Sequence, residues 1–153
     1  MNWTGGCLCG AVHYNFEGDP LWKCHCHCSM CRRLTGAGFA TWVGFPAGAF
    51  SWTKGQPSFY RSSSEVEIGF CQNCSGTMTF HRVHEASAAL GSLDHPEIVP
   101  AGSDDDHVWV EDQIPWLKID DNLPRYEQFT PGLEDERDAL PRMGDNPAHR
   151  DDK

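Results

Sequence analysis

The sequence contains no long hydrophobic run. No segment of its 153 residues approaches the roughly 20 consecutive apolar residues that a membrane-spanning helix needs. Its first residues, MNWTGGCLCG, also lack the basic stretch followed by an apolar run that marks a secretory signal. We therefore expect a soluble, cytoplasmic protein with no membrane partner.

Positive charge is also scarce. The chain has 12 Lys and Arg against 22 Asp and Glu, which gives a formal net charge of -10 at pH 7. Each contact to a phosphate backbone needs Lys or Arg to displace counterions, so an acidic chain binds nucleic acid poorly. Nucleic acid is therefore not an expected partner.

Helical periodicity is missing as well, because no window carries an apolar stripe at helical spacing over three turns. Short segments rich in β-branched and aromatic residues, bounded by Gly, Pro, Ser or Asp, predict strands instead. These segments are 12–16, 39–45, 58–62, 66–71, 77–83 and 107–111, and single helical turns are predicted at 46–50 and 95–101. The sequence predicts a mainly β fold.

One domain is predicted over residues 1–129. A hydrophobic content of 39%, with six Trp and eight Phe, is enough for one ordinary core. Residues 130–153 contain few apolar side chains, three prolines, and seven acidic against four basic side chains. Such a segment cannot bury enough surface to become ordered, so it predicts an acidic, flexible tail. No feature indicates an oligomeric state.

Cysteine is the residue type whose pattern carries most information. The eight cysteines fall into three groups. Cys7 and Cys9 form a C-x-C pair, and Cys71 and Cys74 form a C-x-x-C pair. A dense cluster between them contains Cys24, Cys26, Cys28 and Cys31. An even number permits a disulfide framework, but such frameworks usually spread their cysteines across a short secreted chain. Close pairs bring two thiolates onto one ion, so metal binding is favoured.

The two outer pairs, Cys7 with Cys9 and Cys71 with Cys74, predict a closed shell of four thiolates around a tetrahedral ion. Zinc is favoured over an iron–sulfur cluster, which would usually show a family-specific spacing. Such an ion is structural and contributes its binding energy to folding. Gly76 is suited to the bend that aims the second pair inward.

Strand geometry limits which cysteines of the dense cluster can bind the same ion. Two zinc ligands lie at most roughly 9 Å apart at Cα, whereas Cys24 and Cys28 in an extended strand would be roughly 13 Å apart. If the chain turns at Ser29 and Met30, the ligand set is Cys26, Cys28 and Cys31, with His25 and His27 on the opposite face. Three ligands leave a fourth position for a reacting thiol, which the ion would hold as a thiolate. Alternatively, Cys24 or a histidine closes the shell.

Five segments together resemble a known family. GGCLCGAV, CHCSMCRRLTGAGF, FCQNCSG, GSLDHPE and HVWVEDQIPWL resemble, in this order, the glutathione-dependent formaldehyde-activating enzyme family, which also includes centromere protein V. The resemblance implies a β-tent fold with two zinc ions. It implies that Cys7, Cys9, Cys71 and Cys74 hold the structural zinc, and that Cys26, Cys28 and Cys31 hold the catalytic one.

The resemblance also implies an activity, a carbon–sulfur lyase or synthase acting on formaldehyde, or another small aldehyde, and on glutathione or another thiol. The alternative is a non-catalytic zinc module with two closed sites. Cys24 departs from the family motif, and is either a spare core thiol or a displaceable fourth ligand.

Four residues are candidates for a thiol-substrate pocket. Arg32 and Arg33 follow the last ligand and could pair with a carboxylate of a peptide-like thiol, although a solvated arginine is an equal alternative. His107 and Trp116, together with Trp109, match the late motif of the family, which makes their aromatic rings candidates for the wall of the pocket. Core packing is the alternative for the two tryptophans.

Overall fold

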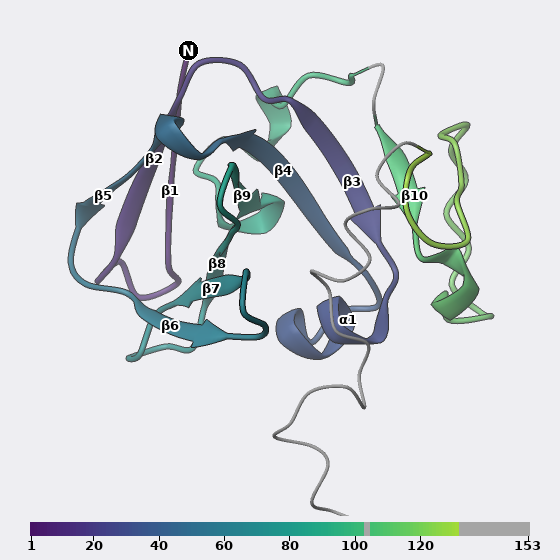
Figure 1. Cartoon of the computed structure of the whole chain (residues 1–153), viewed down its shortest axis with the longest axis horizontal. Helices are drawn as coiled ribbons and strands as arrows, with labels where there is room; N and C mark the ends of the chain where they lie inside the picture. Colours follow the sequence, from purple (N-terminus) through teal and green to yellow (C-terminus); the bar gives the residue numbers. More distant parts are fainter. Residues whose placement is uncertain (103–104, 132–153) are drawn as a thin grey trace, which may run out of the picture.

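A computed structural model describes residues 1–102 and 105–131 of the chain (Figure 1). It contains ten strands: β1 (Asn2–Gly6), β2 (His13–Glu17), β3 (Trp22–Cys26), β4 (Ala40–Pro46), β5 (Phe50–Lys54), β6 (Ser58–Arg61), β7 (Glu67–Phe70), β8 (Thr77–His81), β9 (Glu85–Ala89) and β10 (Asp106–Val108). The helical elements are α1 (Ser29–Thr35) and four single 3-10 turns, η1 (Ala47–Ala49), η2 (Leu90–Ser92), η3 (Pro96–Ile98) and η4 (Val110–Asp112). The predicted mainly β class is confirmed.

The strands form two sheets. The smaller sheet has the order β1-β2-β5, and the larger has the order β10-β3-β4-β9-β8-β7-β6. Every pairing is antiparallel except that of β10 with β3, which is parallel. Strand β3 therefore lies between β4 and a segment about 80 residues further along the chain, which Figure 1 shows on one side of the molecule.

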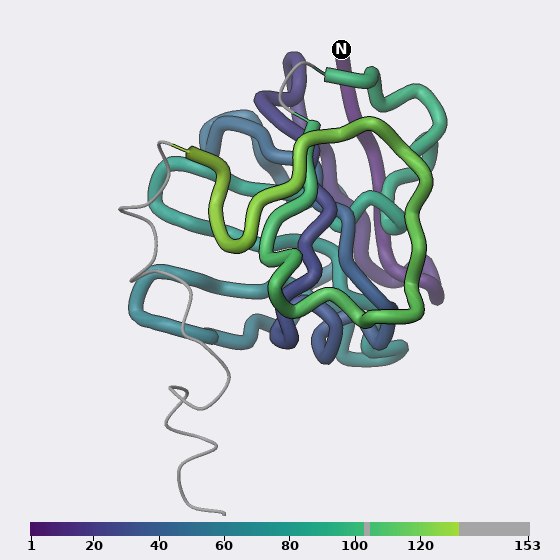
Figure 2. The backbone as a smooth tube through the Cα atoms, turned by 90° about the vertical axis from the view of Figure 1, so that its right-hand side faces the viewer, coloured from purple at the N-terminus to yellow at the C-terminus, as the bar shows by residue number. Residues whose placement is uncertain are grey.

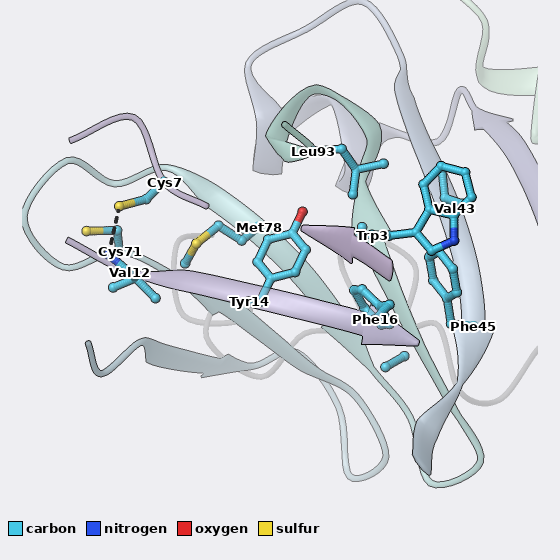
Figure 3. Close-up of a cluster of buried hydrophobic side chains, with 12 residues drawn as sticks. Trp3, Cys7, Val12, Tyr14, Phe16, Val43, Phe45, Cys71, Met78 and Leu93 are labelled. Atoms are coloured by element: carbon cyan, nitrogen blue, oxygen red, sulfur yellow. Dashed lines mark hydrogen bonds between the residues drawn. The ribbon is translucent and has the colours of Figure 1, made fainter. Parts of the chain in front are cut away.

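The first core lies between the two sheets (Figure 3). Alternation along β2 points Tyr14 and Phe16 to the same side, and both are completely buried. The Phe16 ring stacks on the Phe45 ring of β4, with centroids 4.3 Å apart. Aromatic burial of this extent stabilises the contact between sheets.

The second core lies on the other face of β4. Val43 and Phe45 face the first core, whereas Trp42 belongs to a cluster that contains Cys26 and Cys31. Because consecutive strand residues point to opposite faces, β4 is buried on both sides. The inner cysteines are thus part of a hydrophobic core.

An irregular arm follows β10 and returns along it, as Figure 2 shows for the green to yellow part of the tube. The backbone N–H of His107 donates to the Pro124 carbonyl at 2.8 Å, and the Tyr126 N–H donates to the His107 carbonyl at 2.8 Å. The arm thereby pairs with the outer edge of β10 and covers it.

Several predicted elements are confirmed. Strands β4, β6, β7 and β8 correspond to the predicted segments 39–45, 58–62, 66–71 and 77–83, β2 to 12–16, η1 to the turn at 46–50 and η3 to the turn at 95–101. The predicted strand 107–111 is too long, because Trp109 adopts a left-handed conformation with φ 59° and ends β10 at Val108.

Helix α1 was not predicted, because its sequence, SMCRRLT, carries no apolar stripe. It is defined by its ends: Cys28 is the N-cap, and Gly36 adopts φ 69° and donates its N–H to the Arg32 carbonyl. Within the described ranges no helix is long and apolar enough to cross a membrane. The tail predicted at 130–153 falls almost entirely outside the described residues, and the domain boundary at residue 129 stays a prediction.

Candidate active site

The outer cysteines come from two loops, one between β1 and β2 and one between β7 and β8. The sulfurs of Cys7, Cys9, Cys71 and Cys74 all lie within 4.8 Å of one another. The Cys7–Cys9 and Cys9–Cys71 sulfur distances are 3.6 and 3.8 Å. A tetrahedron with zinc–sulfur bonds of about 2.3 Å has sulfur–sulfur edges of about 3.8 Å, so the four donors fit a zinc ion. All eight cysteines are free, which excludes the disulfide alternative.

The second outer loop bends at a different residue from the one that the sequence suggests. Gly10 has φ 70° in the first loop, and Ser75, rather than Gly76, has the left-handed conformation in the second, with φ 59°. The backbone N–H of Val12 donates to the Cys7 sulfur at 3.3 Å. A backbone N–H that donates to a cysteine sulfur stabilises the negative charge of a thiolate, so this loop favours Cys7 as a metal ligand.

The inner cysteines meet where β3 passes into α1. Cys26 ends β3, Cys28 is the N-cap of α1, and Cys31 lies in its first turn. Their three sulfurs lie within 4.8 Å of one another. The expected turn at Ser29 and Met30 is present, as the beginning of α1.

Cys28 is the most acidic of the inner thiols. Hydrogen bonds from the thiols of Cys26 and Cys31 lower the pKa of Cys28 to about 3, and backbone N–H groups of α1 add to this effect against the opposing effect of burial. The Cys26 thiol donates to the Cys28 sulfur at 3.3 Å, and the Cys31 N–H donates to it at the same distance. Cys28 is therefore readily present as a thiolate, the form in which cysteine binds a metal.

The inner group has three donors. Among residues 1–102 and 105–131, no fourth Cys, His, Asp or Glu ligand atom joins the sulfurs of Cys26, Cys28 and Cys31. Cys24 lies in β3 and faces the same side as Cys26, but its sulfur is outside this group. Burial and the negative charge of Asp106 raise the pKa of the Cys24 thiol. The donor set fits an ion that takes its fourth ligand from elsewhere.

A cavity of about 430 Å³ lies beside the inner group, and Cys24, Cys26 and Cys31 form part of its wall. This volume is in the range of pockets that take small molecules. Six aromatic side chains also line the cavity, namely Trp22, Trp42, Phe80, Trp109, Tyr126 and Phe129. No outer cysteine lines the cavity. The two sulfur groups therefore differ in their access to a guest molecule.

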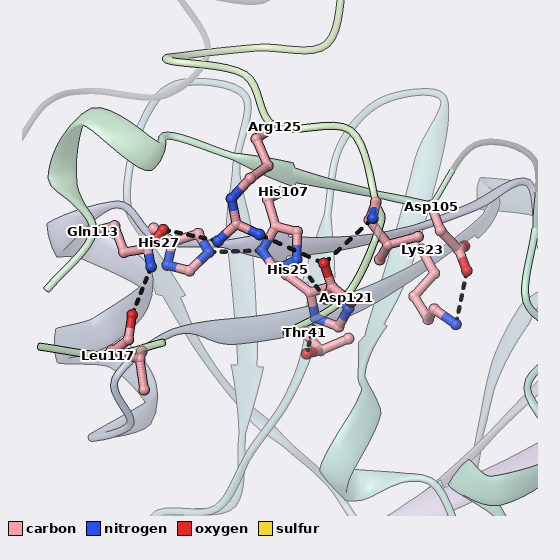
Figure 4. Close-up of polar contacts among 11 residues, drawn as sticks. Lys23, His25, His27, Thr41, Asp105, His107, Gln113, Leu117, Asp121 and Arg125 are labelled. Carbon is pink, nitrogen blue, oxygen red and sulfur yellow. Dashed lines mark hydrogen bonds and ion pairs between the residues drawn. The ribbon is translucent and has the colours of Figure 1, made fainter. Parts of the chain in front are cut away.

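The opposite face of the β3–β10 pair carries a chain of polar side chains (Figure 4). His27 Nε2 lies 2.9 Å from His107 Nδ1, and His107 Nε2 lies 2.9 Å from Asp121 Oδ2. Both histidines are fully buried, and His27 Nδ1 has no hydrogen-bond partner among the described residues. Arg125 lies 3.5 Å from the other oxygen of Asp121. This Asp121–His107–His27 chain ties the arm to the ligand-bearing end of β3.

The alternation of residues along an extended strand predicted that His25 and His27 face away from the sulfurs. In the structure both belong to the opposite face, where the His25 ring contacts the His107 ring with centroids 4.8 Å apart. Asp121 was not singled out, because it lies 14 residues after His107 in an irregular segment without periodicity. No sequence signal connects these two residues.

The cavity is not lined by the four predicted pocket residues. Arg32 and Arg33 lie in α1, His107 lies in the polar chain, and Trp116 is 75% exposed. Trp109, by contrast, is buried and lines the cavity. The packing alternative thus fails for Trp116, and a thiol-binding role for these four residues stays a prediction.

Comparison with known proteins identifies the family. Residues 2–112 match the model of the glutathione-dependent formaldehyde-activating enzyme family, a range that includes all eight cysteines. The chain belongs to this family. The resemblance drawn from the cysteine motifs is therefore confirmed, although the matched range ends before the arm that carries Asp121 and part of the cavity wall.

Individual proteins similar to the chain include a curated relative and a protein of known structure. An uncharacterized lyase of Schizosaccharomyces pombe is 37% identical over 87 residues, which cover 51% of this chain and 56% of that protein. The chain thus spans little more than half the length of this relative. A Rhodobacter sphaeroides protein of known crystal structure shares 24% identity, with a TM-score of 0.49, over 60% of this chain and 87% of that one.

Proposed function

We propose that the protein is a zinc-dependent carbon–sulfur lyase or synthase that joins a small aldehyde to a thiol, or cleaves the adduct. In the forming direction, the thiol sulfur bonds to the aldehyde carbon, the carbonyl π bond breaks, and the thiol proton ends on the oxygen. Formaldehyde and a thiol of the glutathione type are the reference substrates, because they are the substrates in the family description.

One observation carries this proposal: two of the three inner ligands, Cys26 and Cys31, line a cavity of small-molecule size. Cys26, Cys28 and Cys31 would hold one zinc ion, and Cys7, Cys9, Cys71 and Cys74 a second. When bound at the inner group, zinc supplies a coordination position at which an incoming thiol is deprotonated more readily.

The residues around the inner group orient a guest and exclude water. The Cys31 N–H holds the Cys28 sulfur in place from the first turn of α1. Trp42 and Trp109 line the cavity and are both more than nine-tenths buried, so they shield the sulfur of a bound thiol from bulk solvent. A low local dielectric strengthens polar interactions with the reacting groups.

The test is adduct exchange with the zinc-loaded protein, measured by NMR with ¹³C-formaldehyde and a panel of thiols. We expect acceleration over the uncatalysed exchange, and its loss by at least 100-fold in Cys28→Ser. Circular dichroism and a fall from two zinc ions to one per chain would show that this variant keeps its fold. No acceleration with any thiol in the panel would contradict the proposal.

A further inference from the structure

Aromatic rings and the inner cysteines form one buried cluster beside the cavity. Trp42, Phe80 and Trp109 belong to the same hydrophobic cluster as Cys26 and Cys31, and all five side chains line the cavity. The centroids of the Trp42 and Phe80 rings lie 5.7 Å apart. A guest whose sulfur approaches the inner cysteines therefore meets aromatic rings with the rest of its body.

Trp109 has an unusual backbone conformation. Apart from glycines, only Ser75 and Trp109 among the described residues have a positive φ, which is 59° in both. A bulky residue rarely adopts this strained conformation, and strain of this kind clusters at functional sites. The Trp109 N–H donates to the Gln128 carbonyl of the arm at 2.9 Å, which holds the turn. The Trp109 ring lines the cavity and meets the Phe129 ring edge to face, with centroids 5.1 Å apart.

Trp22 is also held in place before any guest enters. Its indole N–H donates to Glu85 Oε2 at 2.8 Å, and its ring lies so close to Gly44 that a Cβ at this position would come within 2.1 Å of it. Glycine leaves room for the ring at this point of β4. Rings that are fixed in this way lose little freedom when a guest binds, which favours binding.

The charged side chains of the wall already have partners within the protein. Among the described lining residues they are Arg82, Glu85, Asp105 and Asp106. Asp105 forms an ion pair of 2.9 Å with Lys23, and Glu85 accepts the Trp22 hydrogen bond. Asp106 accepts a hydrogen bond from Thr130, and the Arg82 guanidinium lies 5.5 Å from the centre of the Phe80 ring. A charged guest has to compete with these partners or leave its own charge unpaired, which is unfavourable in a partly desolvated site.

The cavity is larger than a small aldehyde requires. Its volume is about 430 Å³, whereas formaldehyde is little larger than a water molecule, which occupies about 30 Å³ in the liquid. Most of the space is therefore left for the body of the thiol. Glutathione would bring two carboxylates and one ammonium group into this space, and an aromatic body would bring no charge.

We propose that the thiol partner of this protein has an uncharged, aromatic body, and that Trp109 is the residue that selects it. That the guest is a thiol rests on the proposed function, whereas the character of its body is specified by the cavity. The guest ring contacts Trp109 and its neighbours in the offset or edge-to-face arrangements that aromatic rings prefer.

The arm contributes to this selectivity. Pro124, Tyr126 and Phe129 line the cavity, and all three follow residue 112, where the match to the family model ends. The arm thus builds part of the wall outside the matched region. The preference for an aromatic body is therefore not implied by membership of the family.

The test compares uncharged thiols with glutathione on the zinc-loaded protein, without aldehyde, by isothermal titration calorimetry. We expect 2-phenylethanethiol to bind at least tenfold more tightly than 2-mercaptoethanol, and more tightly than glutathione. The aliphatic analogue 2-cyclohexylethanethiol, which has similar apolar bulk, should bind at least twofold more weakly than 2-phenylethanethiol. Glutathione that binds as tightly as 2-phenylethanethiol, or an aliphatic analogue that binds equally well, would overturn the inference.

Variants of Trp109 test its role as the selecting residue. Trp109→Gly removes the ring and suits the left-handed backbone, and it should reduce the preference for 2-phenylethanethiol over 2-mercaptoethanol at least fivefold. Trp109→Phe keeps an aromatic ring and should retain at least half of the preference. Zinc content and circular dichroism should not change in either variant. An unchanged preference in Trp109→Gly would overturn the inference.

A second ring of the wall gives an independent test, which also holds if Trp109→Gly does not fold. Phe129→Leu should reduce the same preference at least twofold. The matched control is Phe59→Leu, since Phe59 is 48% exposed and does not line the cavity, and the preference should not change. Equal effects of the two substitutions would contradict the assignment of the guest to this cavity.

The outcome separates this inference from the proposed function, because binding is measured without turnover. Selective binding of 2-phenylethanethiol, without accelerated exchange for any thiol, supports the inference and removes the proposed function. Accelerated exchange with glutathione, together with tighter binding of glutathione than of 2-phenylethanethiol, supports the function and overturns the inference.

Discussion

The two cysteine groups use the same ligand atom in different surroundings. The outer group gathers four sulfurs from two loops, and it joins the smaller sheet to the larger one. The inner group gathers three sulfurs from one continuous stretch of six residues that also forms part of a cavity wall. The two groups thus differ in the number of donors and in the access to them, and not in the residue type, and these are the features that distinguish structural from catalytic zinc sites in general.

The largest effect on stability is expected from a substitution that removes a ligand of the outer group. Cys71→Ser removes one of four ligands at a site that closes a long loop, and structural zinc binding contributes on the order of 10 kcal/mol to folding. This is comparable with the whole stability of a domain. We expect the variant to lose one zinc ion and its cooperative thermal unfolding transition.

The matched control for this experiment is Leu8→Ala, since Leu8 lies between Cys7 and Cys9 and is 90% exposed. Its free energy of unfolding should change by less than about 0.5 kcal/mol. A Cys71→Ser protein that unfolds like the wild type would remove the structural role of the outer group.

Removal of metal in steps tests the comparison directly. An ion at the inner group would have three protein ligands and would border a cavity, so a chelator should extract it first. We expect activity and one zinc ion to be lost at chelator concentrations that leave the far-ultraviolet circular dichroism unchanged, and the fold to be lost only with the second ion. Simultaneous loss of both ions would mean that the two groups do not differ.

A smaller effect is expected from the polar chain behind the inner group. Asp121→Ala leaves His107 without its carboxylate partner in a buried position, which should lower the free energy of unfolding by about 1–3 kcal/mol. Asp120→Ala, at the exposed neighbouring position, is the control and should have little effect. Chemical denaturation of both variants gives the two values, and equal values would show that the chain does not stabilise the arm.

The smallest effect concerns His81, which lies away from both sulfur groups. Burial lowers the pKa of His81 below its usual value, so the unfolded chain binds more protons than the folded one as pH falls below about 6.5. The stability that this histidine contributes is full above that pH and is lost below it. His81→Gln should therefore reduce the fall in unfolding temperature between pH 7.5 and 5.5 by at most a few degrees. An unchanged pH profile would contradict this.

The sequence predicted the structure best where the geometry of the backbone and of metal coordination allows few alternatives. The limit on the distance between zinc ligands singled out Cys26, Cys28 and Cys31 and left Cys24 aside, and the structure brings together these three sulfurs without Cys24. The strands with strong alternation, such as β2 and β8, were also predictable.

The remaining features have no local signal. Helix α1 depends on a sulfur cap and on Gly36, and not on an apolar stripe. Asp121 and part of the cavity wall come from an irregular arm whose position is set by backbone pairing with β10. Contacts of this kind are tertiary, so no window of the sequence contains them.

The most direct test of the central claim is ¹¹³Cd NMR of the protein in which cadmium replaces zinc. We predict two resonances. One has a shift typical of four thiolates and does not respond to added thiol. The other has a shift typical of three thiolates with one light-atom ligand, and it moves toward the four-thiolate position when a thiol is added. Two four-thiolate resonances that ignore added thiol, or a single resonance, would contradict the account.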